Sequence, residues 1–339
     1  MVDTIEGAVD LVTTICRRGG AGDFIQATNT LAAESGLVEA VASHDTPALY
    51  GWLMESFSFQ GISDRIAWSY IEDHGNASWF VVEAGLEATR CQCPKLGSFD
   101  AYTGCRYRKV PRTCAEPRFI DGCPVPTLPL RKGDLNQLAY SLYYFLRDRC
   151  GGDLVGFIDR LFALAVADGP ADPIGAKRAA LISEISKVFA VSQKLIAMTF
   201  SVLLMGGRPS RPDWIAVGRS LIAVDSLVHN FLHRTGILSA YGCNHPYGDR
   251  CYGKSGCATV LHDLAARIDA TAINPTFPGV FPRLIQFSIW QFCAETGANI
   301  CNGRRIDDRF GCTNFDCPAG QSCSRIPLRS PPPEDSQPI

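Results

Sequence analysis

Apolar residues recur at helical spacing over most of this chain, and polar residues interrupt them where helices can begin. The stretch Ser220–Leu238, SLIAVDSLVHNFLHRTGIL, shows the pattern clearly. Its apolar positions 227, 228, 231 and 232 share one helical face, and Gly236 supplies a C-terminal stop. Asp225 precedes the run and is a good N-cap, because its carboxylate can accept the free N–H groups of the first turn. We predict a helix that begins directly after Asp225.

Similar apolar runs follow other capping residues along the chain, namely Asp134, Asp153, Ser192 and Asp213. No region is rich in the alternating pattern of strands. Two segments, 91–133 and 243–257, lose the helical period and are rich in Cys and Gly. An ordered loop as long as 91–133 needs something to hold it together. The predicted fold class is therefore mainly α, with cysteine-rich metal or cluster loops.

The same pattern divides the chain into five parts. We expect a helical region over 1–90, the cysteine-rich loop over 91–133, a helical domain over 134–235, helices with a C-terminal cysteine loop over 236–325, and a disordered tail over 326–339. No internal repeat is evident.

Composition and charge narrow the class of protein. The chain has 339 residues, of which 46% are hydrophobic, and this suits a soluble globular protein with a sizeable core. No apolar stretch reaches the length of a membrane span, and the N-terminus lacks a signal-peptide layout, so we expect a cytoplasmic protein. The net charge of −2 neither favours nor excludes nucleic acid, so any such surface must be a local patch.

Fifteen cysteines change this picture, because thiols in a reducing compartment are more often metal ligands than disulfides. The C-terminal set, with spacing Cys-x10-Cys-x4-Cys-x5-Cys, is Cys301, Cys312, Cys317 and Cys323. Four thiolates in so short a segment can wrap one centre, and both iron–sulfur clusters and structural zinc accept such a site. A second set could hold a second centre: Cys93 (or Cys91), Cys105, Cys114 and Cys123.

The remaining cysteines carry weaker expectations. A third site could draw on Cys243, Cys251, Cys257 and Cys293, with His245 as a further ligand. Cys16 and Cys150 lie in helical segments, where we expect buried thiols that act as small apolar side chains.

Two motifs resemble a known family. The segment AVDSLVHNFLHRTG resembles the part of the helix-hairpin-helix DNA glycosylase superfamily that carries its catalytic aspartate, a pattern close to V-D-x-H-V-x-R-x-x-x-R. Here Leu227 replaces the usual histidine and Asn230 the first basic residue. Further on, FPRLIQFSIWQFCAETGANIC resembles the last helix before the iron–sulfur loop of the endonuclease III branch. That branch has the spacing Cys-x6-Cys-x2-Cys-x5-Cys, and this chain keeps the final gap but lengthens the first two.

The family's hairpin, L-P-G-V-G-x-K-T-A, has a degenerate counterpart in VFAVSQKLIAM, Val188–Met198. Ala190 and Ser192 stand where the two glycines belong, and those glycines let backbone N–H groups approach a DNA phosphate. Lys194 stands at the position of the lysine nucleophile that bifunctional members use. The whole resemblance covers about residues 188–323.

The resemblance implies a two-part helical glycosylase-like fold and a monomeric enzyme that excises a damaged or modified base from DNA. Asp225 would stabilise the positive charge that develops on the sugar. Lys194 would add a lyase step through a Schiff base. At least one [4Fe–4S] cluster would be structural, with a second cluster or zinc on the second cysteine set. We expect basic residues of the two cysteine loops to contact DNA phosphates, namely Arg106, Arg108, Lys109, Arg112, Arg304 and Arg305.

Two other classes of function stay open on the sequence. One is a non-catalytic nucleic-acid-binding protein that keeps this fold, which the degenerate hairpin favours. The other is an iron–sulfur redox or sensor protein, because twelve cysteines outside the helical runs exceed what one structural cluster requires.

Overall fold

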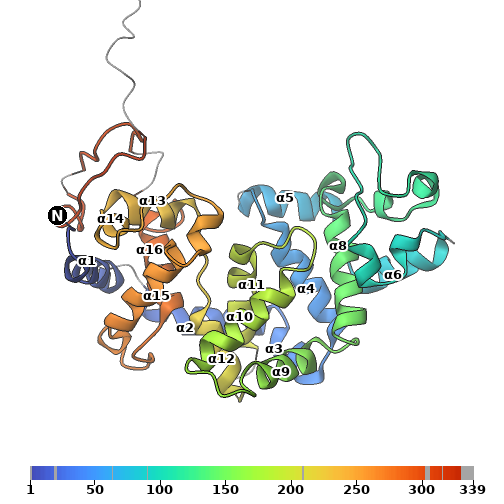
Figure 1. The fold of residues 1–339 in the computed structure, drawn as a ribbon, viewed down its shortest axis with the longest axis horizontal. Coiled ribbons are helices and arrows are strands. Elements are labelled where there is room, and N and C mark those ends of the chain that lie inside the picture. The colour runs from blue at the N-terminus through green and yellow to red at the C-terminus, as the bar shows by residue number, and fades with distance from the viewer. Residues whose placement is uncertain are drawn as a thin grey trace, which may run out of the picture. The chain divides into compact units, whose positions relative to one another are not determined.

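The computed structural model describes residues 2–18, 21–62, 64–89, 91–207, 210–301, 306–314 and 316–329. Within these ranges the chain is helical and has no sheet (Figure 1). Arg108 and Thr113 form an isolated antiparallel bridge. The predicted mainly α fold class is therefore confirmed, whereas its likeness to the glycosylases stays a prediction.

The chain forms two compact units that do not follow chain order. The terminal unit combines Met1–Ala27 with Arg219–Ile339, and the central unit comprises Thr28–Gly218. The helices of the terminal unit are α1 (Ile5–Arg18), η1 (Ala21–Asp23), α13 (Ser226–Arg234), α14 (Ile237–Ala240), η7 (Asp249–Tyr252), α15 (Cys257–Arg267), η8 (Ala270–Ala272) and α16 (Pro282–Cys293). Two helices, α2 (Phe24–Glu34) and α12 (Pro212–Ser220), cross the unit boundaries in sequence.

The central unit contains the remaining elements. They are α3 (Leu37–Ser43), α4 (Thr46–Ser58), α5 (Asp64–His74), α6 (Trp79–Ala88), η2 (Pro94–Leu96), α7 (Phe99–Tyr102), η3 (Pro117–Gly122), η4 (Val125–Thr127), η5 (Leu130–Gly133), α8 (Asn136–Tyr144), the π-helical turn η6 (Phe145–Arg149), α9 (Leu154–Ala165), α10 (Pro173–Ile185) and α11 (Gln193–Gly206). Almost every side chain of α8 is buried, and α8 contacts α4, α6 and α7. An apolar helix of this kind forms the core of its unit.

In the terminal unit, α16 packs against α1, α13 and α15 (Figure 1). The N-terminal helix α1 belongs here because one face of it is apolar at helical spacing and buried: Ala8, Leu11, Val12, Ile15 and Cys16. Cys16 is 1% exposed, which confirms its predicted role as a small buried side chain. Cys150, in the central unit, is equally buried and confirms the same prediction.

Three predicted N-caps are confirmed by hydrogen bonds to first-turn amides. The Asp153 carboxylate accepts the N–H of Gly156 at 2.9 Å, and the Ser192 hydroxyl accepts that of Leu195 at 3.3 Å. The Asp225 carboxylate accepts the N–H of Val228 at 2.9 Å. Each residue satisfies an amide that the helix itself leaves unpaired.

Two predicted N-caps are wrong. Helix α8 begins at Asn136 without a side-chain cap, and Asp134 instead pairs with Lys109 at 2.8 Å. Helix α12 begins at Pro212, so Asp213 lies inside its first turn and pairs with the buried Lys177 at 2.7 Å. In both cases the carboxylate pairs with a lysine that is far away in sequence. A local sequence pattern cannot predict such a pair.

Candidate metal centres

Helix α13 of the terminal unit and its N-cap residue carry polar groups of three kinds. Asp225 caps its N-terminus, His229 is buried in the middle, and Arg234 is buried at its end. Gly236 follows with a left-handed backbone, φ 88°, as predicted for the stop. A Cβ at this glycine would lie 2.8 Å from the carbonyl oxygen of Val2, so position 236 requires glycine for space as well as for φ.

A buried group of two imidazoles and two thiols lies against this helix. One ligand atom each of His229, His245, Cys251 and Cys257 lies within 4.8 Å of all the others, and the group could hold a metal ion. The Nδ1 of His229 is 3.3 Å from the Sγ of Cys257 and 3.6 Å from that of Cys251. The Nε2 of His245 is 3.5 Å from the Sγ of Cys257. Both cysteines and His229 are buried, and His245 is half-buried.

The two thiols of this group influence each other. A hydrogen bond from Cys257 lowers the pKa of Cys251, with a further hydrogen bond from His229 acting in the same direction. The same contact with Cys251, together with burial, raises the pKa of Cys257. One of the two sulfurs is thus favoured as a thiolate even before a cation is present, and thiolate is the form that binds metal.

Part of the predicted third site is therefore present, and part is wrong. Cys251, Cys257 and His245 come together, but Cys243 and Cys293 are outside the group. The Cys243 thiol donates to the carbonyl of Tyr241 at 3.1 Å, and Cys293 contacts Cys301 instead. His229 was missed, because a histidine on a helix with an apolar face is usually a core residue.

The segment that carries three of these ligands also covers the start of α13. The Tyr252 hydroxyl accepts the N–H of Val224 at 2.9 Å, next to Asp225. The Tyr247 ring lies 5.7 Å from the His229 ring and is 49% exposed. Burial raises the pKa of Tyr247, and the negative charge of Asp225 acts in the same direction. Burial lowers the pKa of Arg283 to about 10, and Tyr252 and Asp225 partly offset this.

The C-terminal cysteine set lines one pocket. Its cavity has a volume of about 20 Å³ and is lined by Cys301, Cys312, Cys317 and Cys323, together with Arg234, Phe231 and Phe292. The loop is fixed to the end of α13, because the carbonyl of Arg234 accepts the N–H of Ile326 at 2.9 Å. The Cys323 thiol lies 3.7 Å from the same oxygen. Burial raises the pKa of Cys323 to about 11, so a cationic partner would favour ionisation of this thiol.

Arg234 presents unpaired donors beside this pocket. Its side chain is 4% exposed, and its Nη2 forms an ion pair with Asp308. Its Nε and Nη1 are buried, and neither has a hydrogen-bond partner among the described residues. A buried guanidinium with open donors is costly, so an anionic group in the pocket would relieve it. A hydrogen bond from Cys293 lowers the pKa of Cys301, and the positive charge of Arg234 lowers it further.

The second cysteine set lines a pocket in the central unit. Its cavity has a volume of about 10 Å³ and is lined by Cys93, Cys105, Cys114 and Cys123, with Lys95, Tyr107 and Phe119. Burial raises the pKa of Cys123 to about 12 and also raises the pKa of Cys105. Cys91 does not line this pocket, which favours Cys93 as the first member of the set.

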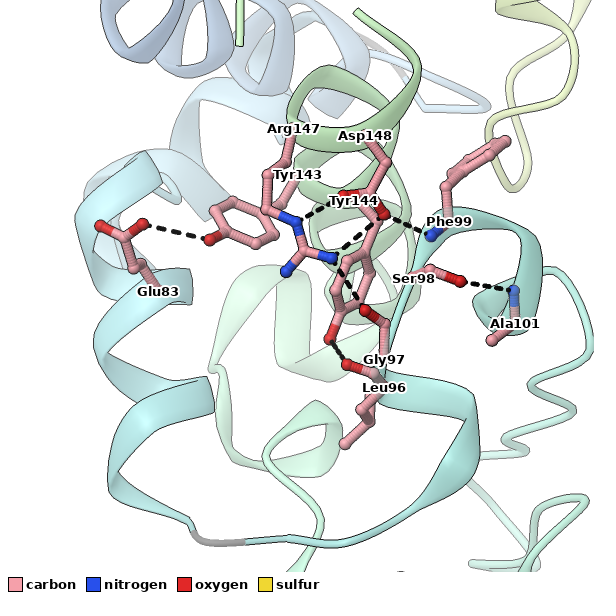
Figure 2. A network of polar contacts seen from close by, with 10 residues as sticks. All are labelled: Glu83, Leu96, Gly97, Ser98, Phe99, Ala101, Tyr143, Tyr144, Arg147 and Asp148. Atoms are coloured by element: carbon pink, nitrogen blue, oxygen red, sulfur yellow. Dashed lines mark hydrogen bonds and ion pairs between the residues drawn. The ribbon is translucent and has the colours of Figure 1, made fainter. Parts of the chain in front are cut away.

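Side chains from α8 and η6 hold this loop in place (Figure 2). The Tyr144 hydroxyl donates to the carbonyl of Leu96 at 2.6 Å, and Arg147 donates to that of Gly97 at 2.9 Å. The Asp148 carboxylate accepts the N–H of Phe99 at 2.6 Å and also pairs with Arg147. The backbone of the loop is thus fixed over residues 96–99.

Four of the residues predicted to contact DNA lie on the same loop, within residues 106–112. Arg106, Arg108, Lys109 and Arg112 are all exposed, and the bridge between Arg108 and Thr113 closes a tight turn. At its tip Val110 is 94% exposed. Lys109 pairs with Asp134, and Arg112 lies 3.8 Å from Asp121. Arg304 and Arg305 lie outside the described residues, as do positions 330–339 of the predicted tail.

The degenerate hairpin joins α10 to α11. Ala190 adopts a left-handed backbone, φ 59°, at a position where the family pattern has glycine. Lys194 lies in the first turn of α11 and is half-buried. Lys194 belongs to the central unit and Asp225 to the terminal unit, and the nucleophilic role of Lys194 stays a prediction.

No family model, curated protein or solved structure matches this chain. Among the described residues, no helix is long and apolar enough to cross a membrane. All fifteen cysteines are free thiols.

Proposed function

We propose that this protein is an iron–sulfur enzyme that excises a damaged or modified base from DNA by cleaving its N-glycosidic bond. The observation that carries the proposal is the arrangement of α13. The helix has Asp225 at its N-terminus, and its C-terminal residue Arg234 lines the pocket of four cysteines. The resemblance in the sequence implies this order of elements, with an aspartate that begins a helix and a cluster loop after it.

Capping and catalysis are compatible roles for Asp225. Its Oδ1 accepts the Val228 amide, and no described residue donates a hydrogen bond to its Oδ2. The carboxylate is partly exposed, so Oδ2 can face a bound nucleotide. When a base leaves, positive charge develops on the sugar, and a fixed carboxylate stabilises that charge and orients the attacking water. The cap fixes the carboxylate before the substrate binds.

The two four-cysteine pockets support a [4Fe–4S] cluster in each. In each pocket four cysteines line one concave site, and four cysteine thiolates are the ligand set of a [4Fe–4S] cluster. In the C-terminal pocket, the unpaired Nε and Nη1 of Arg234 suit an anionic sulfur cluster. Cluster formation would hold each loop in shape, and no step of the reaction runs through it. Base release also needs no lysine, so we assign it to Asp225, and a lyase step at Lys194 is a separate proposal.

The proposed substrate is DNA, and the first experiment identifies which base the protein releases. Wild-type protein purified without air is incubated with DNA that has been alkylated, deaminated or oxidised, and released bases are identified by mass spectrometry. Asp225→Asn is the matched variant, because asparagine caps a helix as well as aspartate does. A second matched variant, Asp172→Asn, changes the cap of α10, where no catalytic role is proposed.

We expect base release by wild type and by Asp172→Asn, and a loss of about 10²–10³-fold in the rate for Asp225→Asn with DNA binding retained. Absence of base release from every DNA by a metal-loaded protein that binds DNA would instead indicate the non-catalytic alternative. Reversible cluster reduction without DNA affinity would indicate the redox or sensor alternative, which the presence of two such pockets favours.

A further inference from the structure

We infer that His229, His245, Cys251 and Cys257 bind a single zinc ion, which holds the segment 243–257 against α13 beside Asp225. This site is separate from both four-cysteine pockets. The proposal that the ion positions an active site depends on the proposed function, whereas the zinc site itself does not.

The ligand geometry fits one tetrahedral ion. With Zn–N near 2.0 Å and Zn–S near 2.3 Å, a tetrahedral site holds a nitrogen and a sulfur about 3.5 Å apart. Three of the four nitrogen–sulfur distances in the group are 3.3, 3.5 and 3.6 Å, and the fourth is within 4.8 Å. A cluster with two irons would place its histidine pair and its cysteine pair on different metals, and so would separate the nitrogens from the sulfurs. The Nδ1 of His229 instead contacts both sulfurs, which indicates one ion.

The donor set points to zinc. Two thiolates and two imidazoles form a common structural zinc site, and four protein ligands leave no open position for catalysis. The Nδ1 of His245 lies 2.8 Å from the carbonyl of Pro246. A proton on Nδ1 that donates to this oxygen leaves the lone pair of Nε2 for the metal, which is the usual arrangement around ligating histidines. Cys257 is the first residue of α15, so the start of that helix supplies one of the two sulfur ligands.

The backbone segments that carry Cys251 and Cys257 lie very close together at Gly256. A Cβ at Gly256 would lie 2.2 Å from the carbonyl oxygen of Arg250 and 2.5 Å from that of Cys251. Only glycine at this position lets η7 and the start of α15 bring their thiols together. The four ligands come from α13, the loop after α14, η7 and α15. One ion would therefore join four segments, and it would fix the loop that carries Tyr247 and Tyr252 next to Asp225.

The test is zinc content and zinc coordination in the full chain, with no readout that involves DNA. The variants Cys251→Ser and His245→Ala each remove one ligand. Cys243→Ser and His233→Gln are matched controls, because Cys243 lies in the same loop and His233 on the same helix, and neither is in the group. Iron and sulfide content and the helical circular dichroism of each variant show whether it still folds.

We expect wild type and both controls to contain about one zinc per chain, with X-ray absorption showing two nitrogen and two sulfur neighbours. Cys251→Ser and His245→Ala should lose this zinc, or its two-sulfur, two-nitrogen signature, while they keep their iron and helical signal. A Cys251–Cys257 disulfide, mononuclear iron in place of zinc, or full zinc coordination in both ligand variants would overturn the inference. If the zinc result holds but Asp225→Asn releases bases at the wild-type rate, the proposed function fails and the zinc site stands.

Discussion

The Nδ1 of His229 lies 3.3 Å from the Sγ of Cys257, and His229 is one turn along the helix that Asp225 caps. The contact joins α13 to the start of α15 and brings the loop between them onto the head of α13. The position of Asp225 is thus fixed by its own hydrogen bond to Val228 and by the contact between His229 and Cys257 one turn further along. A carboxylate that must act on a developing charge benefits from being held in advance.

Tyr247 should act as a stacking surface for the extruded base. Its ring is 49% exposed and lies 5.7 Å from the ring of His229, on the loop that the zinc ion would hold. Tyr247→Ala should lower kcat/KM for base release about tenfold to hundredfold, because stacking of a base on an aromatic ring contributes about 1–3 kcal/mol. Tyr247→Phe keeps the ring and should retain activity. Phe310→Ala removes another exposed ring and serves as control. Equal kcat/KM for Tyr247→Ala and wild type would exclude this role.

The basic tip of the central-unit loop should supply the phosphate contacts. Replacing Arg108 and Arg112 by alanine should weaken duplex binding and should reduce the slope of log K against log salt concentration by about 0.9 for each lost contact. The measurement is a salt titration of the binding constant by fluorescence anisotropy. Arg17→Ala, an exposed cation on α1, is the control and should leave the slope unchanged. A slope that does not differ between the tip variant and wild type would place DNA elsewhere.

Ala190→Gly should stabilise the central unit. Ala190 is exposed and has φ 59°, a conformation that costs an L-residue about 1 kcal/mol and glycine very little. Thermal unfolding should therefore show a higher Tm for this variant. Ala179→Gly, on an exposed face of α10, should show the opposite shift of similar size, because glycine weakens a helix interior. A lower Tm for Ala190→Gly would show that the hairpin does not have this backbone.

Cys16 should make the protein less stable in alkali. Burial raises the pKa of this thiol from 9.0 to about 11, partly offset by a hydrogen bond with Ser288. Between these values the unfolded state loses its proton while the folded state keeps it, so the stabilising contribution is complete below pH 9 and is lost as the pH rises to about 11. The loss is on the order of 2 kcal/mol. Chemical unfolding at pH 8 and pH 10.5 should show a smaller decline for Cys16→Ala than for wild type, and equal declines would contradict the shift.

The local parts of this structure could be predicted from the sequence. The caps at Asp153, Ser192 and Asp225 depend on hydrogen bonds within one turn, so residue type and apolar spacing were sufficient. Both predicted cysteine sets also line single pockets, because their members are close in sequence and lie in segments without a helical period.

The parts that depend on distant contacts could not be predicted in this way. Asp134 and Asp213 are good caps by residue type, but Lys109 and Lys177 pair with them. His229 lies on a helix with a strongly apolar face, where a buried histidine is the ordinary expectation, and its partners are 16 to 28 positions away. The terminal unit joins α1 to helices beyond residue 219 through packing that no local pattern records.

The most direct test of this account is the metal content of the chain. Iron, acid-labile sulfide and zinc are determined on protein purified without air, together with the visible absorption spectrum. Two [4Fe–4S] clusters and one zinc ion predict about eight iron, about eight sulfide and about one zinc per chain, in a brown protein. A colourless protein without sulfide would contradict the account, because the four-cysteine pockets would then hold no cluster and the link from Asp225 to a cluster-bearing enzyme would be lost.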